Sequence, residues 1–262
     1  MGMFIREDRE YDEGVRQTGF RRYQQLLSIR FGSWWKTNLL TLAGFLPLAA
    51  GLIYAIGSTS ILVMLLCSIL GGIIAGPFLA GLYDAILRGL RDDPQPWWDC
   101  YRRAFKQNWK DCMIPGALLG LFIGVYAFMG MLFWWAEVPP SMGTVVLYLT
   151  ALLLTLVINT LYWPQLVLFR QKAGIRLRNC LLFCVRYFWR VLGVGLLQLF
   201  YWAVYLLLAP WTILLLPFIG VWYIVFLSML LIYDNMDESF HIEELYSEDA
   251  AEDYRLSEEL ED

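Results

Sequence analysis

The chain has 262 residues, of which 59% are hydrophobic, 16% are aromatic and only 17% are charged. An ordinary soluble domain has about 25% charged residues and exposes little contiguous apolar surface, so the composition argues against a soluble enzyme or a nucleic-acid-binding domain. The net charge of −4 conceals an asymmetry, because residues 234–262 carry 13 acidic groups and one basic group, while residues 1–233 have a net charge of +8.

The chain begins with a basic segment, residues 1–37, that contains seven Lys or Arg residues and no apolar run typical of a cleaved signal peptide. A helix needs ~20 mostly apolar residues to cross the hydrocarbon core. Six such stretches follow in residues 38–233, and we expect an all-α membrane bundle of six transmembrane helices arranged as three hairpins. The expected spans are Asn38–Gly57, Ser60–Ala80, Met113–Trp135, Thr144–Phe169, Val191–Ala209 and Ile213–Tyr233.

The basic residues give the expected orientation. All 20 lie in the N-terminal segment, in the loops after the second and fourth spans, or in the acidic tail, and the three other loops have none. Because cytoplasmic loops are enriched in Lys and Arg, both termini are predicted to be cytoplasmic. The tail, residues 234–262, is expected to be acidic, cytoplasmic and disordered, with binding to a basic partner as the alternative.

Two cytoplasmic segments, near residues 94–111 and 176–190, have the pattern of amphipathic helices that lie in the headgroup plane. In the first, Tyr101 and Phe105 share a face with two tryptophans, and most of the basic residues lie off that face. Anchoring to lipid and docking of a cytoplasmic partner are both compatible with this pattern. The residues predicted to contact lipid or a partner are Trp98, Arg102, Arg103, Lys106, Trp109 and Lys110.

Groups capable of catalysis are scarce. The single histidine, His241, lies in the acidic tail, so no Ser-His-Asp or Cys-His arrangement is available within the membrane. The five cysteines are expected to be reduced thiols, and we expect no bound metal and no cofactor. Asp84 precedes Arg88 by one helical turn and is interpreted as its ion-pair partner. The sequence therefore predicts a protein that is not an enzyme and does not bind nucleic acid.

Neutral polar residues remain as candidates for ligand binding within the fourth and fifth spans. Such side chains either bind a neutral ligand, for example a sugar hydroxyl, or form hydrogen bonds between helices. The candidates are Asn159, Trp163, Gln165 and Gln198. A stripe of Gly116, Gly120 and Gly124 in the third span predicts close packing of helices, within one chain or between two.

Several short motifs of the membrane body form a recognisable set. They are Asn38-Leu39-Leu40 with Leu46-Pro47, Ala75-Gly76-Pro77, Ala80-Gly81-Leu82-Tyr83, Arg91-Asp92-Asp93, Phe105-Lys106-Gln107-Asn108-Trp109-Lys110 and Pro217-Phe218. In these motifs the chain resembles the YesL-like family of small bacterial integral membrane proteins. The resemblance implies a multi-pass protein of the bacterial plasma membrane. Genes of this family often lie beside carbohydrate uptake systems, which implies an accessory role in ABC-type carbohydrate uptake and a partnership with sugar ABC transporter components. A small-molecule transporter or channel subunit is the alternative.

Overall fold

The computed structural model describes residues 19–246, in which every regular element is a helix. Five helices are long and apolar enough to cross a membrane, so the predicted all-α, multi-pass membrane bundle is confirmed. These five are α1, α2, α4, α5 and α7. The helices are α1 (Gly19–Ser58), α2 (Ile61–Leu90), α3 (Trp97–Asn108), α4 (Met113–Trp135), α5 (Met142–Leu168), α6 (Ala173–Arg186), α7 (Phe188–Leu207), the 3-10 helix η1 (Trp211–Leu215) and α8 (Val221–Phe240).

Helices α1 and α2 form the first hairpin. The turn between them is short because Thr59 adopts a left-handed conformation and Ser60 accepts a hydrogen bond from the backbone of α2. At 1.5 Å per residue, the 40 residues of α1 span roughly 60 Å, twice the thickness of a hydrocarbon core. Helix α1 therefore begins well before the expected span at Asn38 and includes residues that the sequence assigned to a basic segment.

Helix α4 packs against α2 with the two backbones in contact along a stripe of glycines. A Cβ atom added to Gly72 would lie 2.2 Å from the carbonyl oxygen of Gly116, and one added to Gly120 would lie 2.2 Å from that of Ser68. Only glycine permits this approach, and the predicted stripe of small residues is used within the chain. Helices α4 and α5 form the second hairpin, in which the Tyr148 hydroxyl donates to the Tyr126 carbonyl oxygen at 3.0 Å.

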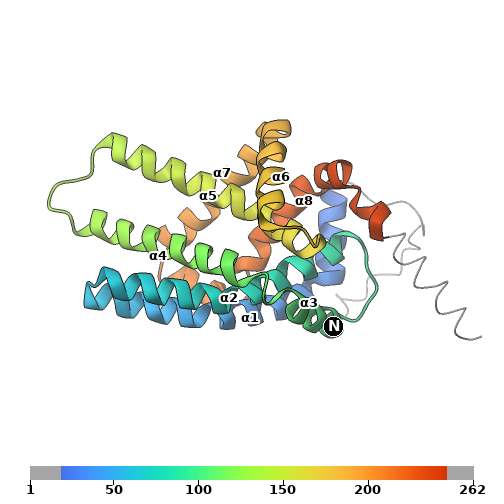
Figure 1. Cartoon of the computed structure of the whole chain (residues 1–262), viewed down its shortest axis with the longest axis horizontal. Helices are drawn as coiled ribbons and strands as arrows, with labels where there is room; N and C mark the ends of the chain where they lie inside the picture. The colour runs from blue at the N-terminus through green and yellow to red at the C-terminus, as the bar shows by residue number, and fades with distance from the viewer. Residues whose placement is uncertain (1–18, 247–262) are drawn as a thin grey trace, which may run out of the picture.

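The two hairpins extend from one end of the molecule (Figure 1), where the basic residues of the described chain are concentrated. We call this the basic end, and it comprises the first half of α1, the α2–α3 turn, α3 and α6. The opposite ends of the hairpins, at Ser58–Ser60 and residues 136–141, are the hairpin tips. Helix α6 stands across the direction of α5 in this view, as expected for a helix lying in the plane of a membrane.

The sixth expected span, Ile213–Tyr233, differs in the structure. Its first part is the short helix η1 followed by turns, and α8 begins only at Val221. Helix α8 then continues past Tyr233 to Phe240. Only its first part is apolar, and α8 is therefore not among the helices that could cross a membrane by length and composition. Pro217 and Gly220 lie in the stretch between η1 and α8, where they interrupt the apolar segment.

The main core lies towards the basic end, where α8 packs among α1, α2, α5, α6 and α7. Its largest side chains are almost fully buried, and include Trp34, Ile86, Trp163, Trp222 and Phe226. The first residues of the expected acidic tail belong to this core, since Met236 and Ile242 have exposed fractions of 1% and 0%. The rest of that tail, residues 247–262, and residues 1–18 lie outside the described part of the chain.

Candidate functional site

Helix α3 is the more strongly amphipathic of the two short helices at the basic end, and one of its faces is fixed to the bundle. The ring of Tyr101 covers Gly81 of α2, where an added Cβ would lie 2.4 Å from the ring. Phe105 makes an edge-to-face contact with Phe78, with ring centroids 5.1 Å apart. The Trp97 indole donates a 2.7 Å hydrogen bond to the Thr37 hydroxyl of α1. These contacts fix the orientation of α3 against both α1 and α2.

The opposite face of α3 carries the residues predicted to contact lipid or a partner. Trp98 and Trp109 have exposed fractions of 51% and 47%, and the four basic side chains between and beside them are also exposed. None of these four makes an ion pair or side-chain hydrogen bond with residues 19–246. We call this set the α3 face: Trp98, Arg102, Arg103, Lys106, Trp109 and Lys110. Tyr101 stacks on Trp98 as expected, with ring centroids 6.3 Å apart, but Tyr101 and Phe105 also pack against α2 and belong to the fixed face.

A network of ion pairs supports α3 at the α2–α3 turn. Arg88 donates to Asp84 at 2.8 Å, as predicted, and also to Asp93 at 2.6 Å. Arg30 of α1 donates to the Asp93 carbonyl oxygen at 2.6 Å. Arg22 of α1 pairs with Asp92 at 2.6 Å, and its side chain is only 7% exposed. The ion pairs thus join the N-terminal half of α1 to the turn that precedes α3.

Sequence reasoning missed this role for Arg22 and Arg30, which had served only as markers of orientation. The available signal was the pair Asp92 and Asp93, two adjacent acidic residues within a basic region. Buried arginines are stable only where acidic or carbonyl oxygen atoms accept their hydrogen bonds. An acidic pair after the second span therefore indicated that some of the basic residues before the first span were internal.

Helix α6, the second predicted interfacial helix, has a buried side and an exposed apolar side. Cys180 and Phe183 are buried, whereas Leu181, Leu182 and Val185 have exposed fractions of 54%, 57% and 80%. Among the residues expected on one side of this segment, Cys180 is buried and Phe188 is 53% exposed. An exposed apolar side on a helix that lies across the spans suits the boundary between headgroups and acyl chains.

The four candidate ligand-binding residues do not converge on one site. Asn159 donates to the Thr155 carbonyl oxygen one turn earlier and accepts a 3.2 Å hydrogen bond from the Trp163 indole. Gln198 of α7 instead donates to Thr160 at 2.5 Å and to Ser228 of α8 at 3.0 Å. Asn159 and Trp163 are thus brought together within α5, while Gln198 links three helices.

Gln165 contacts a cysteine rather than the other three candidates. Its side-chain nitrogen lies 3.2 Å from the sulfur of Cys180 and donates to the Leu161 carbonyl oxygen at 3.1 Å, while its side-chain oxygen is buried without a partner among the described residues. Burial raises the pKa of the Cys180 thiol to about 12, which makes the thiol unreactive near neutral pH. No group of three or more His, Cys, Asp or Glu side chains in residues 19–246 is arranged to hold a metal ion.

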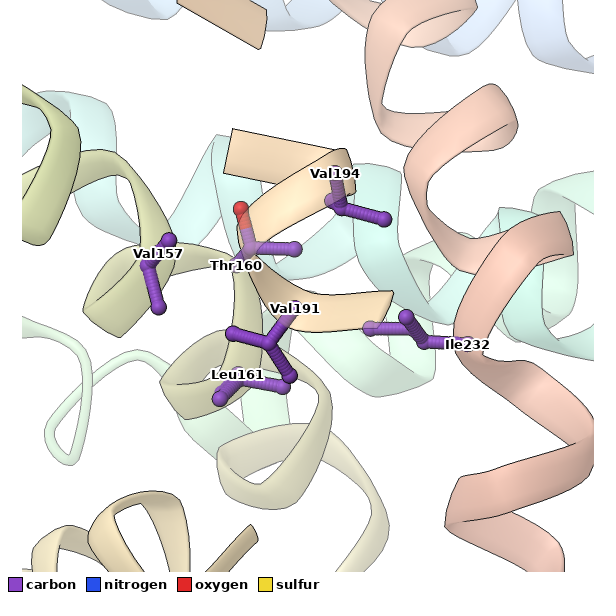
Figure 2. Close-up of a pocket in the computed structure, with 6 residues that line it drawn as sticks. All are labelled: Val157, Thr160, Leu161, Val191, Val194 and Ile232. Carbon is purple, nitrogen blue, oxygen red and sulfur yellow. The ribbon is translucent and has the colours of Figure 1, made fainter. Parts of the chain in front are cut away.

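Two cavities of the described chain are small. One lies between α5, α7 and α8, and Figure 2 shows that the hydroxyl of Thr160 is the single polar group among its labelled side chains. The other, about 30 Å³ in volume, is lined by the ion pairs of Arg88 and by Tyr101, whose buried hydroxyl has no partner among the described residues. A volume of this size holds one or two water molecules and no sugar.

Comparisons with protein-family models, curated proteins and solved structures gave no match. The functional interpretation therefore rests on the geometry of the chain itself and on the resemblance described above.

Proposed function

We propose that this chain is a non-enzymatic membrane protein that holds a partner at the cytoplasmic surface through the α3 face, as an accessory component of ABC-type carbohydrate uptake in a bacterial plasma membrane. The observation that carries the proposal is the α3 face itself. Four cations and two tryptophans point away from a helix whose other face is fixed, and the cations make no ion pair among the described residues.

The chemistry of this face suits a protein or lipid surface with negative charge. Tryptophan and arginine are the residues that contribute most often to the binding energy of protein interfaces. Near an anionic membrane, each basic group contributes roughly 1 kcal/mol, which adds to the binding of a partner that brings its own acidic groups. Because the ion pairs of Arg22 and Arg88 and the hydrogen bond of Arg30 fix α3, the face is ordered before a partner arrives, and less conformational entropy is lost on binding.

A transporter or channel in its own right is less well supported. Its binding site would lie near the middle of the membrane, as in many known transporters. The polar candidates of the apolar helices, Asn159 and Gln198, instead hydrogen-bond to neighbouring residues. The cavity beside Thr160 is apolar and too small for a solute. The carbohydrate part of the proposal is supported by the resemblance to the YesL-like family.

Charge reversal on the α3 face tests the proposal. We expect Arg102→Glu with Lys106→Glu to abolish co-purification of the ABC permease subunits and to lower sugar uptake by cells, while the protein still inserts and folds. Lys172→Glu with Arg178→Glu is the matched control, since both are exposed basic residues near or on α6 without an ion pair among the described residues. Equal losses in the two variants would show that only the total charge matters. Sugar uptake by liposomes that contain this chain alone would support the transporter alternative.

A further inference from the structure

The segment between α7 and α8 exposes an unusual amount of apolar surface for an irregular stretch of chain. Residues 191–233 contain no charged residue. Around the turn, large apolar side chains have exposed fractions from 43% to 82%. They are Leu206, Leu207, Leu208, Trp211, Ile213, Leu214, Leu215, Phe218 and Ile219. Such a surface is stable in an apolar environment, so its depth relative to the membrane decides what covers it.

Asn38 of α1 fixes the depth of the inner end of this segment. Its side-chain nitrogen donates to the carbonyl oxygens of Leu216 at 2.9 Å and of Pro217 at 3.1 Å. Asn38 precedes the end of α1 at Ser58 by 20 residues, or about 30 Å of helix, which matches the thickness of the hydrocarbon core. With the hairpin tips at the outer surface, Leu216 and Pro217 lie at the inner boundary of that core.

Further hydrogen bonds keep the rest of the segment near Leu216 and Pro217, the residues that Asn38 binds. The Tyr201 hydroxyl donates to the carbonyl oxygens of Ile219 at 2.5 Å and of Gly220 at 2.9 Å, and the Tyr205 hydroxyl also donates to Ile219. Thr212 then donates to the Tyr205 carbonyl oxygen at 2.6 Å. The apex of the turn is therefore only a few residues from groups that contact Asn38. Consistent with this, the hairpin tips of α1–α2 and α4–α5 extend beyond α7 and α8 in Figure 1.

Most polar backbone groups of the segment have hydrogen-bond partners within the chain, as an environment without water requires. Irregular backbone within the hydrocarbon core requires internal partners for its polar groups. Pro210 and Pro217 have no N–H group, and eight other N–H groups of the segment donate to carbonyl oxygens within the chain. These eight belong to Leu208, Ala209, Trp211, Thr212, Ile213, Leu216, Phe218 and Ile219. The carbonyl oxygens next to α8 accept from the side chains of Asn38, Tyr201, Tyr205 and Trp222.

After the turn, α8 leads directly to the basic end. Trp222 and Phe226 contact the ring of Trp34, with centroids 5.8 and 4.5 Å apart. The hydroxyl of Tyr223 lies 3.0 Å from that of Tyr23, which is near the start of α1. The first turns of α8 thus pack against the half of α1 that precedes Asn38, and no part of α8 approaches a hairpin tip.

We propose that α7, residues 208–220 and α8 form a re-entrant hairpin whose turn is covered by the acyl chains of the cytoplasmic leaflet and does not reach the outer surface. Acyl chains are the occupant that the uncharged, exposed side chains and the self-satisfied backbone favour. Exposed apolar side chains of α7 itself, for example Phe200, continue the same surface. This proposal is independent of the function proposed for the α3 face.

Cysteine accessibility tests it in the full-length protein, in a background without the five native cysteines. Trp211→Cys and Leu214→Cys probe the turn, since these side chains are 76% and 69% exposed. Ser141→Cys reports the hairpin tip, and Arg170→Cys reports the basic end. We expect a membrane-impermeant maleimide to label Ser141→Cys in intact cells and Arg170→Cys only after permeabilisation. Both turn variants should react at least ten times more slowly than Ser141→Cys in intact cells, and at least ten times more slowly than both controls after permeabilisation.

A second measurement places the turn within the lipid. In reconstituted protein, a bimane label on either turn cysteine should be quenched by lipids brominated on the acyl chain and unaffected by iodide in water. Labelling of the turn from outside intact cells would overturn the proposal in favour of a complete sixth span. Rapid labelling only after permeabilisation, or quenching by iodide, would overturn it in favour of a turn in the cytoplasm. Protection from both reagents without quenching by brominated lipid would mean that protein covers the turn, which also overturns it.

Discussion

Replacing Asn38 with alanine should destabilise the protein more than any other single loss of a polar side chain in α1. The side chain is fully buried and makes three contacts: it donates to Leu216 and Pro217, and it accepts a 3.3 Å hydrogen bond from the backbone N–H of Trp222. Interhelical hydrogen bonds in membranes contribute about 0.6 kcal/mol on average and up to about 1.7 kcal/mol. Three such bonds give an expected loss of about 2 to 5 kcal/mol in the free energy of unfolding.

The measurement is the free energy of unfolding in mixed micelles titrated with SDS. Asn159→Ala is the matched control, because the Asn159 side chain bonds only within its own helix, and we expect a loss of about 1 kcal/mol or less. Asn38→Asp should be no better than alanine, since a carboxylate cannot donate to the two carbonyl oxygens and introduces a charge. If Asn38→Ala and Asn159→Ala are equally stable, the contacts of Asn38 do not hold the α7–α8 turn.

Three further results are expected. Gly116→Leu should separate α2 from α4 and lower the melting temperature by several degrees, because an added Cβ lies 2.5 Å from the Gly72 carbonyl oxygen. Gly193→Leu is the control and should leave the melting temperature nearly unchanged, because an added Cβ there meets nothing within 4 Å. With Cys180 as the sole cysteine, alkylation by iodoacetamide at pH 8 should be on the order of 1000-fold slower than for a free thiol, since burial raises the thiol pKa from 9.0 to about 12. The stability that the protonated thiol allows should be full below pH 9 and lost as the pH rises towards 12. An alkylation rate equal to that of the denatured protein would contradict this. Ile242→Asp should destabilise the fold by about 3 kcal/mol in the same SDS titration, because a fully buried side chain becomes charged, and an unchanged transition would show that Ile242 is not part of the core.

The sequence predicted the elements that are defined by a local pattern. Helix α4 has the expected bounds, Met113–Trp135, because its apolar residues are flanked on one side by Lys110 and Asp111 and on the other by a loop. The amphipathic pattern near 94–111 predicted α3, and spacing alone predicted the ion pair of Asp84 and Arg88. In each case the residues that determine the structure lie within a few turns of one another.

The interrupted sixth span could not be predicted in this way. Hydropathy is the same for a straight span and for an apolar turn, and the contacts that stabilise the turn come from Asn38, 178 and 179 residues earlier. The same applies to the α3 face. Its residues were predicted, but which aromatic side chains remain exposed depends on Gly81 and Phe78 of α2, since their contacts turn Tyr101 and Phe105 inwards.

The long separation between Asn38 and its partners has a consequence for biosynthesis. Ribosomes add about 5 to 20 residues per second, so roughly 10 to 35 s pass between the synthesis of Asn38 and that of Leu216. During this interval the first hairpin is already in the membrane, and the amide of Asn38 has neither Leu216 nor Trp222 to bind. An insertase or chaperone that shields polar groups where α1 enters the bilayer would therefore act on this hairpin, and a chain truncated before Leu216 would remain its client.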